Sequence, residues 1–155
     1  LVANRGEIAV RIIRAAEDVG IPTVSIGTAA EAGSLHVTLS KEHATLSGSG
    51  VQAYLDIDAV MDIAKRYKCT AIHPGYGLLS ESPALSRACE KARIAFVGPP
   101  THFIEVFGNK VAARKLAAAC GIPVLPGTSR AVTGADEVTA FGNQVGYPVM
   151  LKAGA

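Results

Sequence analysis

The sequence predicts an α/β protein built on a parallel β-sheet flanked by helices, followed by the first elements of a second domain. Short apolar runs alternate with helical patterns as far as Pro100, a rhythm typical of right-handed βαβ units. Apolar residues make up 49% of the 155 residues and aromatic residues only 5%, so the core must be rich in small aliphatic side chains, which suits strands covered on both faces. The alternation is lost after Pro100, so we expect one domain at residues 1–100 and the start of another at 101–155.

The first strand is expected at Leu1–Ala3 and the first helix from about Gly6 to Val19. Apolar side chains recur in that helix at the spacing of one face, which we expect to point inward: Ile8, Ile12, Ala15, Ala16 and Val19. Gly20 and Pro22 then supply a helix stop.

Two β-like runs and a capped helix follow. PTVSI at residues 22–26 and EHATL at 42–46 predict strands, and GSG at 48–50 predicts a loop. Asp56 is suited to cap a helix that runs to about Tyr67, because its side chain can accept from the unpaired N–H groups of the first turn. Within that helix we expect three side chains to face the core: Val60, Ile63 and Ala64.

The next βα unit contains an unusual loop. CTAI at residues 69–72 predicts a strand, which leads into HPGYGLLSES at 73–82. Ser82 and Pro83 combine a capping residue with a proline at the first helical position, so a helix should run to about Ala92. IAFVG at 94–98 predicts a further strand, closed by two prolines.

The second domain opens with helices. Thr101 should cap a short helix to about Phe107, and Asn109 should cap a longer one at 110–120, which is ended by glycine and proline. A further helix is expected at 133–145, followed by a strand at 148–152 (PVMLK).

Composition excludes several partners and locations. The net charge is +2 and the sequence has no basic stripe, so we expect no nucleic-acid partner. The sequence also lacks an apolar run long enough for a membrane span, so we expect no membrane partner. Cys69, Cys89 and Cys120 are widely spaced and fit reduced thiols packed as small apolar side chains, which indicates the cytoplasm, or the mitochondrion in a eukaryote. The chain begins without Met and stops just after an expected strand, so both ends are interpreted as cut.

Two loops at the carboxyl ends of expected strands are candidates for ligand binding, because loops and helix starts converge at that edge of a parallel sheet. ANRGE at residues 3–7 lacks a GxGxxG fingerprint, so its simpler interpretation is a turn with Asn4 as helix cap and Glu7 facing the helix dipole. HPGYG at 73–77 holds its side chains on a constrained backbone. Tyr76 and Glu81 could equally belong to a binding surface or pack against neighbouring residues. His73 is better interpreted as a core histidine whose hydrogen bonds are made within the protein.

Two lysines occupy positions that favour a bound phosphate. Lys110 begins a helix, where a positive charge is unfavourable beside the helix dipole and an arriving phosphate would relieve the cost. Lys152 ends an apolar run, where a charge is unusual without a partner. Projection of either side chain into water is the alternative. The sequence contains no HExxH, Walker loop, G-x-S-x-G elbow or histidine cluster, so we expect neither a catalytic residue nor a metal site within it.

Taken together, in order and spacing, several segments resemble the biotin carboxylase family. They span nearly the whole chain: LVANRGEIAVRIIRAA, AYLDID, AIHPGYGLLSES, FVGPP, GNKVAARKLA, GIPVLPGT and VGYPVMLKA. Members of this family are the ATP-dependent components of acetyl-CoA, propionyl-CoA and pyruvate carboxylases and of urea amidolyase. The resemblance implies a Rossmann-like domain up to Pro100 and the first elements of an ATP-grasp fold after it. It also implies a ligase that phosphorylates bicarbonate with ATP to carboxyphosphate and passes the carbon to biotin.

The resemblance assigns roles to individual residues. Lys110 and Lys152 would contact the phosphates of ATP, where ammonium groups offset the charge on the transferring phosphoryl oxygens. Tyr76, Gly77 and Glu81 would line the pocket for bicarbonate and biotin, with Glu81 as a polar organiser rather than the base.

Partners and cofactors follow from the same resemblance. They are ATP with Mg²⁺, biotin on a carrier domain or protein, a carboxyltransferase component, and a second copy of the subunit bound through Arg11, Arg14 and Asp18. In acetyl-CoA carboxylases this activity serves fatty acid biosynthesis. The metal-binding and catalytic glutamates of the family, and the glycine-rich loop over ATP, follow the position of Lys152. We therefore expect the present chain to be inactive alone.

The chain departs from the family pattern at three places. Asn109 stands where Asp is common, which leaves the charge of Lys110 less compensated and should alter nucleotide affinity. Ser80-Glu81-Ser82 replaces Ser-Glu-Asn, and GTAAEAGS at 27–34 replaces an acidic loop.

Two other functions are considered. A carbamoyl-phosphate-synthase-like ATP-grasp ligase is disfavoured by the HPGYG and ANRGEIA segments. A non-catalytic Rossmann-like binding module is disfavoured by the missing GxGxxG and by the position of the lysines.

Overall fold

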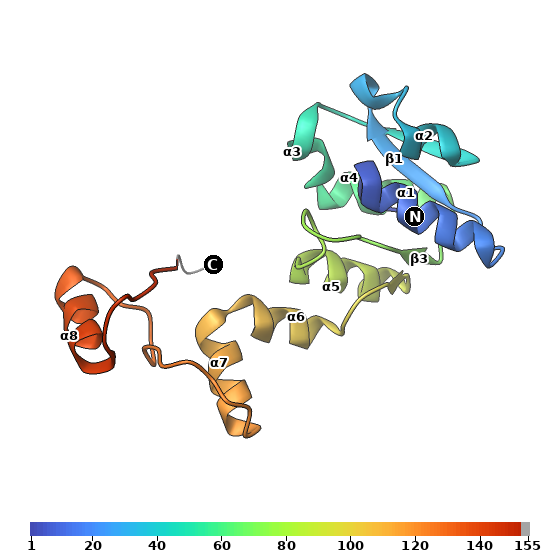
Figure 1. The fold of residues 1–155 in the computed structure, drawn as a ribbon. Helices are drawn as coiled ribbons and strands as arrows, with labels where there is room; N and C mark the ends of the chain where they lie inside the picture. Colours follow the sequence, from blue (N-terminus) through green and yellow to red (C-terminus); the bar gives the residue numbers. More distant parts are fainter. Residues whose placement is uncertain (153–155) are drawn as a thin grey trace. The chain divides into compact units, whose positions relative to one another are not determined.

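The computed structural model describes residues 1–152, and the chain divides into two compact units, Leu1–Thr101 and His102–Ala155 (Figure 1). No helix within residues 1–152 is long and apolar enough to cross a membrane.

The first unit contains two parallel strand pairs. β1 (Val24–Thr28) pairs with β2 (Glu42–Leu46), and β3 (Ala71–Ile72) pairs with β4 (Ala95–Phe96). β2, β3 and β4 lie within or on the ranges that the sequence predicted, although β3 and β4 are shorter than expected, and β1 begins and ends two residues later than the predicted strand at 22–26. All pairs are parallel, as the βαβ rhythm requires.

The beginning of the chain joins the two pairs into one sheet. Val2 bridges Ser25 on one side and His73 on the other, both in parallel. The Val2 N–H donates to the Val24 carbonyl oxygen at 2.9 Å, and the Ala3 N–H donates to that of His73 at 2.8 Å. The order across the sheet is therefore β2, β1, the first segment, β3, β4, which is the winding of a Rossmann-like sheet. The predicted fold class is confirmed.

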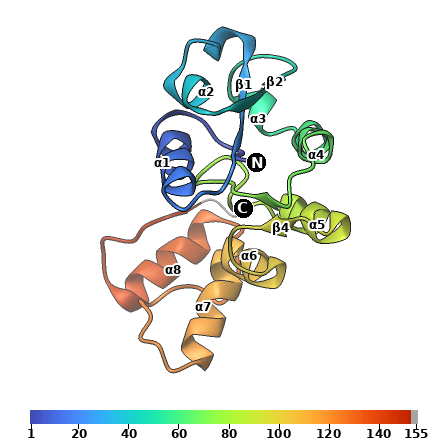
Figure 2. The same cartoon turned by 90° about the vertical axis from the view of Figure 1, so that its right-hand side faces the viewer.

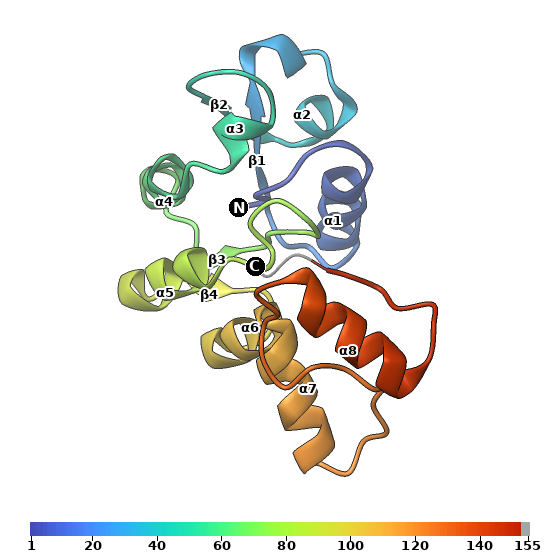
Figure 3. The same cartoon turned by 90° about the vertical axis from the view of Figure 1, so that its left-hand side faces the viewer.

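Helices cover both faces of this sheet (Figures 2 and 3). α1 (Gly6–Asp18) and α2 (Leu35–Leu39) lie on one side, and α4 (Ile57–Arg66) and α5 (Pro83–Ala92) lie on the other. Two short helical turns follow the first strands: η1 (Ala29–Glu31) and α3 (Gly50–Tyr54). The sequence did not predict α2, α3 or η1, because elements of so few residues show no helical periodicity.

Local capping sets the start of three helices. The carboxylate of Asp56 accepts from the Ala59 N–H at 3.0 Å to begin α4. The Ser82 hydroxyl accepts from the Leu85 N–H at 3.3 Å, and Pro83 is the first residue of α5. Asn109 caps the helix that begins at Lys110. These three predicted caps are confirmed, whereas Thr101, which was also predicted to cap a helix, is itself the first residue of α6 (Thr101–Gly108).

The buried face of α1 differs from the prediction. Ala9 and Ile13 are the buried residues, whereas Ala15 is exposed and Val19 lies beyond the helix end with 68% of its surface exposed. Apolar side chains occur on more than one side of α1, so spacing alone does not identify the inward face. The small Ala9 side chain lets the helix pack closely on Val2 of the central strand.

The main apolar cluster lies between the sheet and helices α4 and α5. Its fully buried members include Ile26, Ile72 and Leu85. The three inward residues predicted for α4 are buried as expected: Val60, Ile63 and Ala64. Tyr54 is also buried, so a phenol is taken into an otherwise aliphatic core and needs a hydrogen-bond partner there.

The three thiols differ in their surroundings. Cys89 is buried in the core and Cys69 is half-buried, as expected for small apolar side chains. Cys120 is exposed at the end of α7 (Lys110–Ala119), so the prediction of packing is wrong there. None of the residues of α7 is buried, so this helix offers Cys120 no core in which to pack.

The second unit is helical in its described part. α6 (Thr101–Gly108) leads into α7, and α8 (Ala135–Val145) follows an extended segment. Arg114 of α7 donates to carbonyl oxygens of Leu125, Gly127 and Thr128, which ties that segment to the helix. The strand predicted at 148–152 is wrong, since these residues are irregular. A strand requires a hydrogen-bonded neighbour, and none lies beside them within residues 102–152.

Candidate functional site

The two candidate loops meet at the carboxyl edge of the sheet. Asn4 leaves the central strand, and its side-chain amide donates to the carbonyl oxygens of Pro74 at 2.6 Å and Tyr76 at 2.9 Å. The edge lies between the central strand and β3, where the winding of the sheet reverses. Ligands of open α/β sheets collect at this position. The ANRGE turn and the HPGYG bend therefore form one joined surface at the expected place.

Asn4 does not cap α1, so this part of the prediction is wrong. The N-cap residue is Arg5, which makes no side-chain capping bond. The side-chain oxygen of Asn4 instead accepts from the Arg5 N–H at 2.8 Å. The amide is therefore used for a contact with residues far away in sequence, which local spacing cannot reveal.

Tyr76 and Gly77 lie on the bend itself. Tyr76 is 60% exposed, and its phenol donates to the Glu7 carboxylate on the first turn of α1. This hydrogen bond and the negative charge of Glu7 raise the pKa of Tyr76. Gly77 has a φ of 60°, and a Cβ added there would meet no atom within 4 Å. Glu81 is exposed in the turn before α5 and makes no hydrogen bond or ion pair within the described residues.

His73 behaves as a satisfied histidine at the start of the bend. Its Nδ1 accepts from the Gly75 N–H at 3.1 Å, and burial lowers its pKa. The histidine is thus neutral at pH 7 and shapes the bend.

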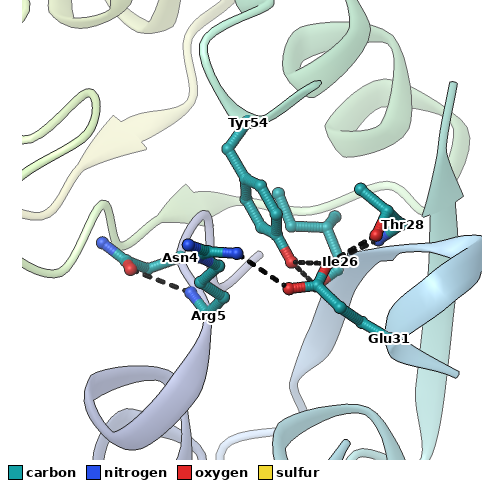
Figure 4. Close-up of polar contacts among 6 residues, drawn as sticks. All are labelled: Asn4, Arg5, Ile26, Thr28, Glu31 and Tyr54. Atoms are coloured by element: carbon teal, nitrogen blue, oxygen red, sulfur yellow. Dashed lines mark hydrogen bonds and ion pairs between the residues drawn. The ribbon is translucent and has the colours of Figure 1, made fainter. Parts of the chain in front are cut away.

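A partly buried ionic network anchors the ANRGE turn (Figure 4). The Arg5 guanidinium contacts Glu31 at 3.2 Å and lies 5.7 Å from the centre of the Tyr54 ring. Glu31 also accepts from the Thr28 N–H at 2.9 Å, the Thr28 hydroxyl at 2.8 Å and the Tyr54 phenol at 2.8 Å. The sequence analysis missed this network. Its signal was the Thr-x-x-Glu capping box at Thr28 and Glu31.

The network shifts the titration of both acidic groups. Burial alone would raise the pKa of Glu31, but the hydrogen bonds from Thr28, Tyr54 and Arg5 outweigh it and lower the pKa from 4.5 to about 2. Burial and the hydrogen bond to Glu31 raise the pKa of Tyr54. At neutral pH the network therefore holds one carboxylate, one neutral phenol and one guanidinium.

The residues predicted for a homodimer surface lie along α1. Arg11 and Arg14 are exposed and line a hollow of about 860 Å³ with Arg5 and His36, and Asp18 is exposed at the helix end. His36 is only 2% exposed. Its Nε2 is buried and has no hydrogen-bond partner within residues 1–152. Burial lowers the pKa of His36, so the ring is neutral at pH 7.

The two lysines lie in the second unit. Lys110 is the exposed first residue of α7, and the Asn109 side chain there accepts from the Val111 N–H at 3.1 Å and the Ala112 N–H at 3.0 Å. Lys152 is exposed in the irregular segment after α8. A hollow of about 630 Å³ in this unit is lined by Arg114 and other residues but by neither lysine. Phosphate binding by the lysines therefore stays a prediction.

Metal-binding residues are not grouped in the described part of the chain. Between residues 1 and 152, no three His, Cys, Asp or Glu side chains lie close enough together to hold a metal ion.

The fold and the joined loops define a class: a Rossmann-like α/β unit with two loops joined at the edge where such sheets bind ligands, followed by a second compact unit. Comparison with known proteins specifies the family. Residues 1–104 match the family described as "Biotin carboxylase, N-terminal domain", and residues 109–155 match "Carbamoyl-phosphate synthase L chain, ATP binding domain". The chain belongs to the biotin carboxylase family.

Curated relatives align with the chain over its whole length. It is 46% identical to the biotin carboxylase of Halalkalibacterium halodurans, covering 100% of this chain and 34% of the relative. It is also 46% identical to the pyruvate carboxylase of Bacillus subtilis, covering 99% of this chain and 14% of the relative. The chain thus spans about a third or less of the length of these relatives.

Solved structures give the same assignment. The biotin carboxylase domain of a single-chain bacterial carboxylase superimposes with a TM-score of 0.91 at 47% identity, covering 97% of this chain and 35% of that one. The biotin carboxylase domain dimer of Hydrogenobacter thermophilus 2-oxoglutarate carboxylase, in complex with MgADP, ADP and bicarbonate, gives 0.91 at 36% identity, covering 95% and 32%. The predicted family is confirmed.

Proposed function

We propose that this chain forms the N-terminal part of the biotin carboxylase component of a biotin-dependent carboxylase. In that enzyme a bicarbonate oxygen attacks the γ-phosphorus of ATP, which gives ADP and carboxyphosphate. Carboxyphosphate then breaks down to CO₂ and phosphate, the released phosphate takes the proton from N1 of carrier-bound biotin, and N1 attacks the carbon of CO₂ to give carboxybiotin. The reaction class is an ATP-dependent ligase, and the 155 residues alone are inactive in this proposal.

The observation that carries this proposal is the contact of Asn4 with the HPGYG bend. It joins the two segments that resemble the family most clearly, at the sheet edge where α/β proteins bind ligands. Tyr76 and Gly77 would contact bicarbonate and biotin from this edge, and Glu81 would organise polar groups beside them. The exposed ring of Tyr76 supports this role, because a ligand could lie against its open face.

Lys110 and Lys152 would bind the ATP phosphates. Both carry a positive charge, and ammonium groups placed against the phosphates stabilise the transferring phosphoryl group. Mg²⁺ would accompany ATP and neutralise part of its charge. Ammonium groups are not magnesium ligands, so oxygen ligands for it would come from the protein beyond Lys152.

The partners would be a biotin carboxyl carrier, a carboxyltransferase component and a second copy of the subunit. Arg11, Arg14 and Asp18 would belong to the homodimer surface, and their exposure along one helix supports this. The enzyme would act in the cytoplasm, or in the mitochondrion of a eukaryote.

The test is bicarbonate-dependent ATP hydrolysis by the full-length subunit with free biotin. Lys110→Ala and Lys152→Ala should each raise the KM for ATP, whereas Lys115→Ala, an exposed lysine on the same helix α7, should leave it unchanged. Hydrolysis that requires ammonia instead of biotin would favour a carbamoyl-phosphate-synthase-like ligase. Absence of bicarbonate-dependent hydrolysis would overturn the proposal.

A further inference from the structure

The contact between the ANRGE turn and the HPGYG bend is built to hold one geometry. Asn4 is 3% exposed, and both hydrogens of its side-chain amide point to backbone oxygens of the bend, those of Pro74 and Tyr76. Its oxygen is held in turn by the Arg5 N–H. An asparagine amide fixed by three hydrogen bonds has little freedom to rotate.

The backbone of the bend lies directly against Asn4. Gly75 has a φ of 67°, and a Cβ added there would lie 2.7 Å from Asn4 Nδ2 and 3.0 Å from its Cγ. No side chain larger than hydrogen fits between the two segments. Gly77 has a similar φ of 60° but no atom within 4 Å of the corresponding position. The requirement for glycine at residue 75 therefore comes from the contact, in addition to the backbone conformation.

The ring of Tyr76 has a separate support. Its phenol donates to Glu7, which lies on the first turn of α1, only three residues after Asn4. The remaining surface of the ring is largely open, since 60% of the residue is exposed. Without the phenol contact, an exposed tyrosine side chain would sample several rotamers.

The turn that supplies both contacts is itself anchored in the core. Arg5 lies between Asn4 and Glu7 in sequence, and its guanidinium contacts Glu31, which also binds the buried Tyr54 phenol (Figure 4). The support for the bend thus continues into the sheet and does not rest on a mobile loop alone.

We propose that Asn4 and Glu7 are positioning residues for Tyr76: Asn4 fixes the backbone of the bend, and Glu7 fixes the orientation of the phenol ring. This inference rests on the proposed function, in which Tyr76 faces bicarbonate and biotin. It assigns to the ANRGE turn a role in binding the carboxyl acceptor rather than the nucleotide. Variants of Asn4 and Glu7 should therefore raise the KM for biotin and leave the KM for ATP unchanged.

The first experiment measures steady-state kinetics of the full-length subunit with free biotin, ATP and bicarbonate. Glu7→Ala and Tyr76→Phe should each raise the KM for biotin by about threefold to tenfold, the loss expected for one hydrogen bond. The double variant should match either single variant, because both changes remove the same contact. Glu7→Gln, which keeps an acceptor, should recover most of the loss, and Glu17→Ala at the other end of α1 is the matched control.

The second experiment follows the Tyr76 phenol by NMR in the full-length subunit labelled with ¹³C at tyrosine Cζ. Its signal is identified by its loss in Tyr76→Phe. Glu7→Gln should lower the pKa of Tyr76, because the charged partner that favours the neutral phenol is removed. This readout does not depend on turnover.

The outcomes separate the two proposals. If the wild-type subunit hydrolyses ATP with bicarbonate but Glu7→Ala and Tyr76→Phe leave the KM for biotin unchanged, the positioning role is overturned. An unchanged pKa of Tyr76 in Glu7→Gln overturns the contact itself. If the wild-type subunit has no such activity, the proposed function fails, whatever the NMR titration shows. Asn4→Asp should lower kcat/KM for biotin by about tenfold to a hundredfold, since a carboxylate oxygen would face the carbonyl oxygens of Pro74 and Tyr76. If the Asn4→Asp variant does not fold, the Glu7 variants decide whether the turn positions Tyr76.

Discussion

Glu31→Gln removes the negative charge at the centre of the network beneath the ANRGE turn and keeps the shape of the side chain. The carboxylate accepts four hydrogen bonds, from the Thr28 N–H and hydroxyl, from Tyr54 and from Arg5. Glutamine keeps one acceptor oxygen but turns an NH₂ group toward donors. The variant therefore tests whether the charge, rather than the packing, stabilises the first unit.

The size of the effect follows from the titration of Glu31. Its pKa is lowered from 4.5 to about 2, and each pH unit corresponds to about 1.4 kcal/mol, so the charge contributes about 3 kcal/mol. Solvent screens only part of this, because 18% of the side chain is exposed. The folded-state pKa is the lower one, so the contribution is complete above about pH 4.5 and is lost as the pH falls toward 2.

Urea unfolding of the wild-type chain and of Glu31→Gln, followed by circular dichroism, measures this contribution. The difference in unfolding free energy should be about 3 kcal/mol at pH 7 and should fall by about half near pH 3. Glu17→Gln on exposed α1 surface is the control and should change stability by less than about 0.5 kcal/mol. A difference that stays constant from pH 7 to acid would show that packing, not charge, is responsible, and our reasoning would be wrong.

Three further predictions concern other contacts. Gly75→Ala should destabilise the first unit by at least about 1 kcal/mol more than Gly77→Ala, because both residues have positive φ but only the first added Cβ meets Asn4; equal unfolding free energies would contradict this. Burial lowers the pKa of His36 below 6.5, so the unfolding free energy of the wild type should fall as the pH drops below 6.5. His36→Gln should lose less stability over the same pH range, because it has no imidazole to protonate. Parallel curves of unfolding free energy against pH for the two proteins, measured in urea, would refute this prediction. Asn109→Asp should stabilise α7 by about 0.5 kcal/mol, because a charged cap interacts better with the helix dipole, and hydrogen exchange of the α7 amides should slow accordingly.

Features of the fold that depend on neighbouring residues were predictable from the sequence. The caps at Asp56, Ser82 and Asn109 are each decided by one side chain and the N–H groups two or three residues later. The strand at Glu42–Leu46 was predicted with the bounds that the structure has. By contrast, the strand expected at 148–152 fails because its formation depends on a neighbouring strand, and no local pattern reports whether one is there.

In the candidate site, too, local features were predictable from the sequence and contacts between distant residues were not. HPGYG and ANRGE were recognised as loops at strand ends from their composition. Their contact through Asn4 was not, because it joins residues about seventy positions apart, and the pattern near Asn4 resembles an ordinary helix cap. The network at Glu31 was missed although a capping box marked it, since a capping box alone does not predict that a buried phenol and an arginine also bind the same carboxylate.

The central position of Leu1–Ala3 in the sheet has a consequence for synthesis on the ribosome. This segment is made before the other strands of the first unit, yet its two neighbours are made at different times: β1 follows soon afterwards, whereas Ala71–His73 appear only when most of the first unit has been translated. Until then one edge of the segment has open hydrogen-bonding groups. The nascent chain must keep that edge from pairing wrongly, and the second neighbour of the segment arrives only shortly before the bend that carries Tyr76 leaves the exit tunnel.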